Sequence, residues 1–292
     1  MRSSALLSAC LITLGPGQGG SHAGEALLQC IARHGQAALK ACDEATGSDL
    51  GPADRAAAHY HKGLELMSLG RDEAAARAFI EAAHLTPGVP AVHTSLGVAL
   101  AHLLRWHEAA QAHRQALRAD PNDPDAHYNL GVALSHLGRW TEAVTEFRTA
   151  TQLNPSDADA HYNLGVAFSA VGRQEEAIAA YGEAVRVRPG YAAAWGNLGM
   201  AALLLGRDRE AAAAFTCADA AQPGYFETRE VQRGAWEAVR RRLREAPCSS
   251  AAKSCGGASS SLAARGGGPP TVCDGYNEAR PPNPSRKGPD RP

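Results

Sequence analysis

The sequence repeats itself every 34 residues across its central part, and this period constrains the fold more than any other feature. Five repeats follow one another without insertion, and they begin at Ala56, Pro90, Pro124, Ala158 and Ala192. Four positions hold one residue type in every repeat: Gly at position 8, Ala at positions 20 and 27, and Pro at position 32. A repeat of this length cannot bury its apolar face alone, so neighbouring repeats are expected to stack.

Each repeat is predicted to be a pair of antiparallel helices. Gly at position 8 and Ala at position 20 remove side-chain bulk where the two helices cross. Gly at position 15 allows the positive φ that ends the first helix, and Pro at position 32 stops the second. Three residues depart from the pattern: Lys62 at position 7 of the first repeat, and Leu104 and His113 at positions 15 and 24 of the second. We therefore expect an all-α fold whose packing differs locally in these two repeats.

The stretches that begin AHYNLGVAL at Ala126 and AHYNLGVAF at Ala160 resemble the tetratricopeptide repeat (TPR). The resemblance implies an α-solenoid of five TPR helical hairpins with a C-terminal capping helix. The expected hairpins are 56–89, 90–123, 124–157, 158–191 and 192–225. The resemblance also implies a non-catalytic scaffold for protein-protein interaction. Such a scaffold binds an extended peptide segment of another protein in a concave groove and needs no cofactor.

The same resemblance assigns the groove to the first helix of each hairpin. The implied peptide-binding residues are Tyr60, His61, Val98, Tyr128, Asn129, Val132, Tyr162, Asn163, Val166, Asn197 and Met200. An asparagine amide can donate to and accept from a peptide backbone, and aliphatic neighbours can bury the peptide's side chains. Asparagine is also common at position 6 of idealised repeats, whatever they bind.

The asparagine column suggests a second function as well. It resembles the repeat arm of O-linked N-acetylglucosamine transferases, so the chain could instead be a recognition arm acting in trans for a glycosyltransferase. A chaperone C-terminus is not the expected partner, because positions 2, 5 and 6 carry no Lys or Arg, and Asp125 and Asp159 make position 2 acidic.

The segments that flank the repeats are expected to cover the ends of the array. Residues 24–55 are predicted to be a degenerate N-terminal helical hairpin, and residues 226–246 a C-terminal capping helix. In the latter, Val231, Trp236, Val239 and Leu243 are predicted to share one apolar stripe. Residues 247–292 are rich in Gly, Pro and Ser, which predicts a disordered tail.

The N-terminus has the features of a signal peptide. Arg2 precedes an apolar run over residues 5–14, and Ser21 and Ala23 are small residues at a cleavage site, so residues 1–23 are expected to be removed on export. The protein is then expected to be periplasmic or secreted. A lipid anchor on Cys10 is the minor alternative. No transmembrane segment is expected, because no run of eighteen apolar residues occurs.

Cys30 and Cys42 lie on two short predicted helices that can fold back around His34 and Gly35. In an oxidising compartment this arrangement favours a disulfide, whereas two buried thiols are the alternative.

Charge and histidine content exclude other classes of function. The net charge of -1 gives no field that would attract nucleic acid. A column of histidines at position 4 consists of His59, His93, His127 and His161. Stacked helices lie about 10 Å apart, whereas the ligands of one zinc ion lie about 2 Å from it, so we expect a structural role and no metal.

Overall fold

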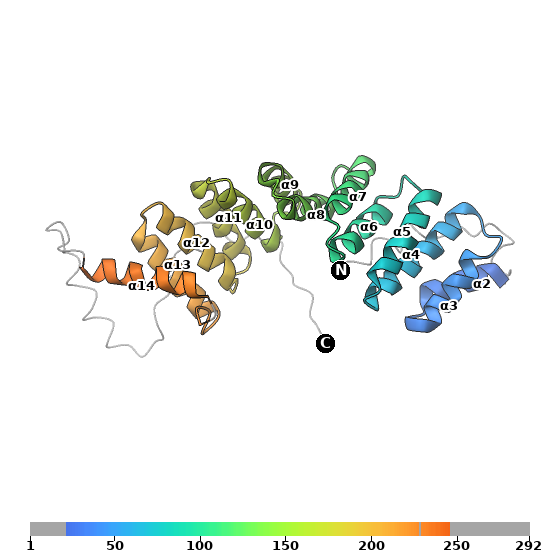
Figure 1. The fold of residues 1–292 in the computed structure, drawn as a ribbon, viewed down its shortest axis with the longest axis horizontal. Helices are drawn as coiled ribbons and strands as arrows, with labels where there is room; N and C mark the ends of the chain where they lie inside the picture. The colour runs from blue at the N-terminus through green and yellow to red at the C-terminus, as the bar shows by residue number, and fades with distance from the viewer. Residues whose placement is uncertain (1–21, 228, 246–292) are drawn as a thin grey trace, which may run out of the picture. The chain divides into compact units, whose positions relative to one another are not determined.

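The computed structural model describes residues 22–227 and 229–245 of the chain. This part contains thirteen helices and no strand, which confirms the expected all-α fold of helical hairpins. The chain divides into two compact units, Met1–Pro155 (unit 1) and Ser156–Pro292 (unit 2). In the described part, unit 1 holds α2 to α9 and unit 2 holds α10 to α14 (Figure 1).

From His22 onward, unit 1 consists of four consecutive helical hairpins. Their helices are α2 (His22–Ala32), α3 (Gly35–Thr46), α4 (Pro52–Ser68), α5 (Asp72–Leu85), α6 (Pro90–His102), α7 (Trp106–Ala119), α8 (Pro124–His136) and α9 (Trp140–Leu153). Helix α4 begins at Pro52, before the expected repeat start at Ala56, because proline fits the first turn of a helix. Each helix packs against the next one along the chain.

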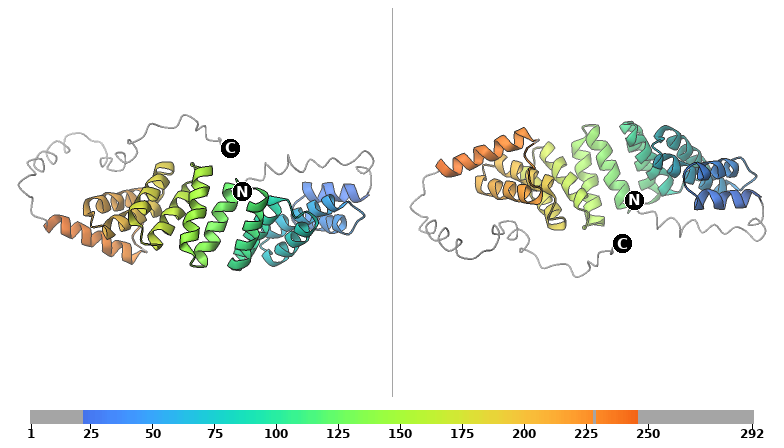
Figure 2. Two further views of the ribbon diagram at one scale, coloured as in Figure 1. Left: turned by 90° about the horizontal axis from the view of Figure 1, so that it is seen from above. Right: turned by 90° about the horizontal axis from the view of Figure 1, so that it is seen from below.

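In its described residues, unit 2 consists of two hairpins followed by a single helix. Its helices are α10 (Ala158–Ala170), α11 (Gln174–Val187), α12 (Ala192–Leu204), α13 (Asp208–Ala221) and α14 (Glu230–Glu245). Helix α14 packs against α13 and α12 (Figure 2). Of the predicted signal peptide, only His22 and Ala23 are described, as the first residues of α2. Cys10 and the predicted tail lie outside the described residues.

The glycine at position 8 of each repeat lies beneath the ring at position 24 of the same repeat. A Cβ atom added to Gly131 would lie 2.7 Å from Cε1 of Phe147, closer than real Cβ contacts allow. The same relation holds in the other four repeats, for the pairs Gly63 with Phe79, Gly97 with His113, Gly165 with Tyr181, and Gly199 with Phe215. The repeated glycine therefore permits the ring to rest on the backbone of the first helix.

The turn inside each hairpin has a residue with positive φ at position 15. It is glycine in four repeats, at Gly70, Gly138, Gly172 and Gly206, as the sequence predicts. In the second repeat Leu104 adopts the same conformation, with φ 59°, and its side chain is 70% exposed. The hairpin geometry thus holds even a leucine in the left-handed region, at a cost of about 1–3 kcal/mol.

His113 replaces the aromatic ring at position 24 of the second repeat, and it is only 1% exposed. Its Nδ1 atom has no hydrogen-bond partner among the described residues. Burial lowers the pKa of His113 from 6.5 to about 4, because the imidazolium would lose its hydration. The folded protein therefore holds this ring neutral.

The stability of the protein is expected to fall in mild acid through His113. Between the unfolded pKa of 6.5 and the folded pKa of about 4, the unfolded chain binds more protons at this site than the folded chain does. The contribution of neutral His113 to the free energy of unfolding is therefore fully present above the unfolded pKa. It is lost as the pH falls toward the folded pKa. Relative to H113F, the wild type should lose about 2 kcal/mol of unfolding free energy between about pH 7.5 and about pH 5. Urea titrations of both proteins at the two pH values measure this difference, and equal losses would contradict the assignment.

The ring at position 4 joins successive hairpins within each unit. Nε2 of His93 lies 2.8 Å from the carbonyl oxygen of Pro87, and Nε2 of His127 lies 3.0 Å from that of Pro121. Trp195 does the same in unit 2, where its Nε1 donates to the carbonyl oxygen of Pro189 at 2.9 Å. These contacts confirm the structural role predicted for the column at His93 and His127. The ring of His127 also places Nδ1 2.7 Å from Oε2 of Glu146.

Cys30 and Cys42 are joined by a disulfide between α2 and α3, with their Cα atoms 4.6 Å apart. The chain reverses at His34 and Gly35, and Gly35 has the positive φ that this short turn requires. Both cysteines are buried. The expected pairing is therefore present, and it is of the kind that oxidising compartments preserve.

Helix α14 is held by fewer residues than the sequence predicts. Val239 is fully buried, and the Trp236 ring lies 5.1 Å from that of Phe226 and 5.7 Å from that of Phe215. By contrast, Val231 is 78% exposed and Leu243 is 36% exposed. The prediction of one stripe was wrong for Val231, because eight residues exceed two helical turns and rotate it away from Val239.

Candidate functional site

The predicted binding residues of unit 1 lie on the first helices of its hairpins, α4, α6 and α8. We call this set the unit 1 first-helix surface, and it consists of Tyr60, His61, Val98, Tyr128, Asn129 and Val132. Tyr60 is buried and the other five are half-buried. Helix α6 lies against both α4 and α8, and Oγ of Ser95 donates to the Tyr60 hydroxyl at 3.4 Å. Adjacent hairpins thus bring these side chains into neighbouring positions.

The predicted residues of unit 2 lie on α10 and α12, which also contact each other. This unit 2 first-helix surface consists of Tyr162, Asn163, Val166, Asn197 and Met200, all of them half-buried. Nδ2 of Asn197 donates to the Tyr162 hydroxyl at 3.2 Å. Burial raises the pKa of Tyr162, so the hydroxyl keeps its proton.

The three asparagines of the predicted ladder differ in how far their amides are already used. Both ends of the Asn197 amide are engaged, because its Oδ1 also accepts from Nε2 of Gln232 on α14 at 3.2 Å. Asn163 donates from Nδ2 to the carbonyl oxygen of Asp159 at 3.0 Å. Asn129 makes no side-chain hydrogen bond within the part of the chain that the structure describes. Only the Asn129 amide keeps its full capacity for a ligand.

The residue at position 5 of the preceding repeat explains why the Asn129 amide is unpaired. Ser95 and Asn197 each meet a tyrosine hydroxyl there, Tyr60 and Tyr162 respectively. Before Asn129 the same position is Thr94, whose shorter side chain leaves its buried Oγ1 without a hydrogen-bond partner among the described residues.

Sequence reasoning missed a cluster of polar side chains in unit 2. The Arg188 guanidinium binds both carboxylate oxygens of Asp159, from Nη1 to Oδ1 at 3.0 Å and from Nη2 to Oδ2 at 2.7 Å. It also stacks 4.7 Å from the centroid of the Tyr191 ring, which in turn lies 5.0 Å from that of Tyr162. The Arg188 hydrogen bonds hold the pKa of Asp159 below its ordinary value. The acidic character expected at this end of α10 is therefore neutralised within the protein.

The described residues show neither a metal site nor a membrane-spanning helix. No group of three or more His, Cys, Asp and Glu side chains is placed there to hold a metal ion. None of the described helices combines the length and apolar character that crossing a membrane requires.

Comparison with known proteins identifies the repeats. The family described as "TPR repeat" matches residues 105–138 and 136–172, and the family described as "Tetratricopeptide repeat" matches residues 158–191. No curated protein matches the chain.

Solved structures show the same fold. One is YrrB, described as a TPR protein with an unusual peptide-binding site (22% identity, TM-score 0.56, covering 69% of this chain and 96% of YrrB). A second is MamA from Desulfovibrio magneticus RS-1 (25% identity, TM-score 0.56, covering 59% and 97%). Another MamA structure has 24% identity and a TM-score of 0.54, and covers 56% of this chain and 96% of its own.

Proposed function

Because this chain is a tetratricopeptide-repeat protein, we propose that it is a non-catalytic scaffold that binds an extended segment of another protein. The observation that carries the proposal is the uncommitted amide of Asn129 on the unit 1 first-helix surface. An amide of this kind can donate to one peptide group and accept from another, which is how a polar side chain recognises an extended backbone.

The surroundings of Asn129 suit a peptide. Val98 and Val132 are half-buried aliphatic side chains, which can bury apolar side chains of the ligand on either side of the backbone contact. Tyr128 adds an aromatic ring with a polar hydroxyl, a combination that is frequent at interfaces. The peptide-binding site named for YrrB, which shares this fold, supports the same use of the repeats.

The recognition arm of a glycosyltransferase system was the alternative raised by the sequence. It depended on a continuous column of asparagine amides that could act as equivalent contacts. Asn197 is already bound by Tyr162 and Gln232, and Asn163 by the backbone of its own helix. Since these amides differ in availability, we favour the general peptide scaffold.

A site-specific crosslink tests where a partner binds. A photoreactive amino acid placed at Val132 should capture the partner from cells of the native host. The matched control is the same amino acid at Thr145, an exposed residue on the second helix of the same hairpin. Capture from Thr145 as efficient as capture from Val132 would place the binding surface elsewhere.

Asn129→Ala is expected to weaken binding of the captured segment, prepared as a synthetic peptide. Loss of the amide leaves a peptide backbone group without its partner, which costs about 1–3 kcal/mol and corresponds to about a 5- to 150-fold rise in Kd. Fluorescence polarisation with labelled peptide measures the change. Thr145→Ala serves as the control and should bind like the wild type, and an N129A protein of unchanged affinity would refute the assignment.

A further inference from the structure

The first repeat differs from the other four in the pairing of one arginine. Position 16 is arginine in every repeat, and it precedes the second helix. In repeats two to five this arginine forms an ion pair with glutamate three residues later, in the pairs Arg105 with Glu108, Arg139 with Glu142, Arg173 with Glu176, and Arg207 with Glu210. In the first repeat the glutamate is replaced by Ala74.

This replacement leaves the Arg71 guanidinium uncommitted. Among the described residues it forms no ion pair, side-chain hydrogen bond or ring contact. A guanidinium is a planar fork of donors that matches a carboxylate or a phosphate with two parallel hydrogen bonds. The other four repeats show that this chain normally supplies a carboxylate at that place.

A second departure from the repeat pattern lies beside the first. Lys62 stands where the other repeats have leucine. Its side chain is 28% exposed, and Nζ lies 2.5 Å from Oδ1 of Asp43 on α3. A leucine at this position would fill the space between helices with apolar atoms, whereas Lys62 brings a positive charge into it.

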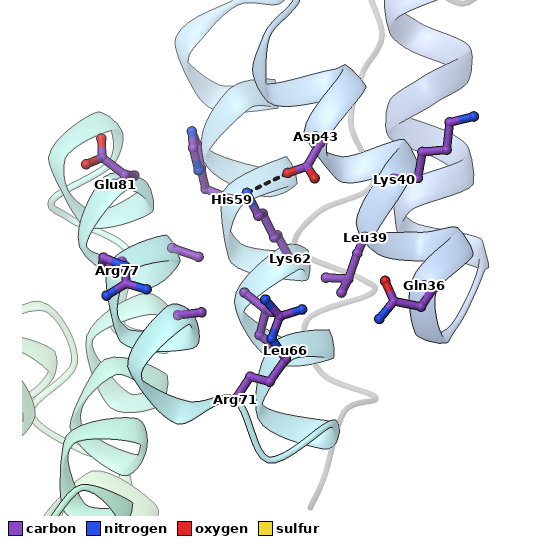
Figure 3. Close-up of a pocket in the computed structure, with 12 residues that line it drawn as sticks. Gln36, Leu39, Lys40, Asp43, His59, Lys62, Leu66, Arg71, Arg77 and Glu81 are labelled. Carbon is purple, nitrogen blue, oxygen red and sulfur yellow. Dashed lines mark ion pairs between the residues drawn. The ribbon is translucent and has the colours of Figure 1, made fainter.

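The two departures meet in one pocket between α3, α4 and α5. The pocket has a volume of about 470 Å³ and is lined by both Lys62 and Arg71 (Figure 3). Leu39, Leu66 and Ala78 supply apolar surface to it. In Figure 3 the Arg71 side chain runs beside Leu66 in the direction of Lys62.

The charge around the pocket is positive. Four cationic side chains, Lys40, Lys62, Arg71 and Arg77, line it together with only two carboxylates, Asp43 and Glu81. Lys40 and Arg77 each have a partner on their own helix, Glu44 at 4.0 Å and Glu73 at 3.8 Å. Arg71 therefore remains as the cation whose charge the protein does not balance directly.

We propose that this pocket binds a small organic anion, a molecule that carries a carboxylate or phosphate group on a short apolar body. The anionic group pairs with Arg71 and approaches Lys62, and the apolar body lies against Leu39 and Leu66. The volume falls in the range of about 300–1,000 Å³ that is typical of small-molecule sites.

This anion pocket is separate from the peptide surface proposed above. Lys62 and Leu66 are four residues apart and share one face of α4, while His61 of the unit 1 first-helix surface projects from another face of the same helix. Failure of either proposal therefore leaves the other in place.

Binding of simple probes to the full-length chain tests the anion pocket. Isothermal titration at constant ionic strength would use inorganic phosphate, phenyl phosphate and benzoate. The wild type should bind one or both of the aromatic probes more tightly than inorganic phosphate, and the comparison of phenyl phosphate with benzoate identifies the preferred anionic group. Absence of binding by all three probes in the millimolar range would overturn the proposal.

Ala74→Glu supplies the decisive variant. It restores the glutamate that pairs with this arginine in the other repeats. The fold should therefore be kept, while the new carboxylate forms an ion pair with Arg71 and competes with the ligand. The Kd of the preferred probe should rise about tenfold or more, as expected when a charge-assisted pair is lost. Lys62→Leu, which restores the other consensus residue and fills the pocket, should weaken the probe to a similar extent. Wild-type affinity in both variants would refute the site.

The matched control asks whether an unpaired arginine is sufficient. Glu142→Ala frees Arg139 in the third repeat, where Leu130 occupies the position of Lys62. We expect no additional binding of the probe to this variant. A second site of equal affinity would show that the pocket in the first repeat contributes nothing specific.

Discussion

Replacement of Gly131 by leucine should lower the free energy of unfolding by about 3 kcal/mol, the upper part of the range for an overpacked core. Even the Cβ atom of the new side chain would lie 2.7–3.0 Å from three atoms of the Phe147 ring. The ring cannot move away freely, because Phe147 is only 1% exposed. Helices α8 and α9 would have to separate to admit the side chain. Urea unfolding followed by circular dichroism measures the loss.

The same substitution at Gly234 is the control for helix propensity. A Cβ atom at Gly234, in α14, would meet nothing within 4 Å. There leucine should stabilise the helix by about 0.5–1 kcal/mol, because glycine is a poor helix former. If G131L and G234L shifted stability in the same direction, the close contact between Gly131 and Phe147 would not explain the glycine column.

Val239→Asp should detach α14 from unit 2. Val239 is fully buried, and a carboxylate at its position would lose its hydration without gaining a partner. The helix can avoid this cost only by detaching from α12 and α13, so the free energy of its packing is lost. We expect the free energy of unfolding to fall by about 3 kcal/mol. Detachment would also release Gln232 from Asn197. Hydrogen exchange should therefore become faster in α14 and in the facing parts of α12 and α13.

The matched control is Val231→Asp on the same helix. This valine is 78% exposed, so the added charge stays in water and stability should change by no more than about 0.5 kcal/mol. Loss of α14 protection in V231D as well would mean that charge on this helix, and not burial at Val239, controls its attachment.

The helices were predictable from the sequence because their determinants recur at fixed positions of each repeat. Glycine at position 8, glycine at position 15 and proline at position 32 act within one hairpin, and the structure shows the local geometry that each requires. The exposure of Val231 could also have been found, because its spacing from Val239 does not match whole turns of a helix.

The candidate sites were predictable only in part. Which side chains lie on the first helices follows from the repeat pattern, but their availability depends on contacts between distant residues. Asn197 meets Gln232, 35 residues later, and Asp159 meets Arg188, 29 residues later. Such contacts are set by side-chain conformations that no local pattern specifies. The unpaired state of Arg71 could be predicted from the sequence, because Ala74 interrupts a column of glutamates. Only the structure shows that Lys62 lines the same pocket.

The joint between hairpins at position 4 is built from two chemically different rings. Both ring nitrogens of His127 face acceptors, the carbonyl oxygen of Pro121 and the carboxylate of Glu146. Trp195 makes the corresponding joint in unit 2 with a neutral indole, which always carries its hydrogen. The same place in the repeat therefore accepts either ring, and the histidine adds a second contact that reaches the other helix of its own hairpin.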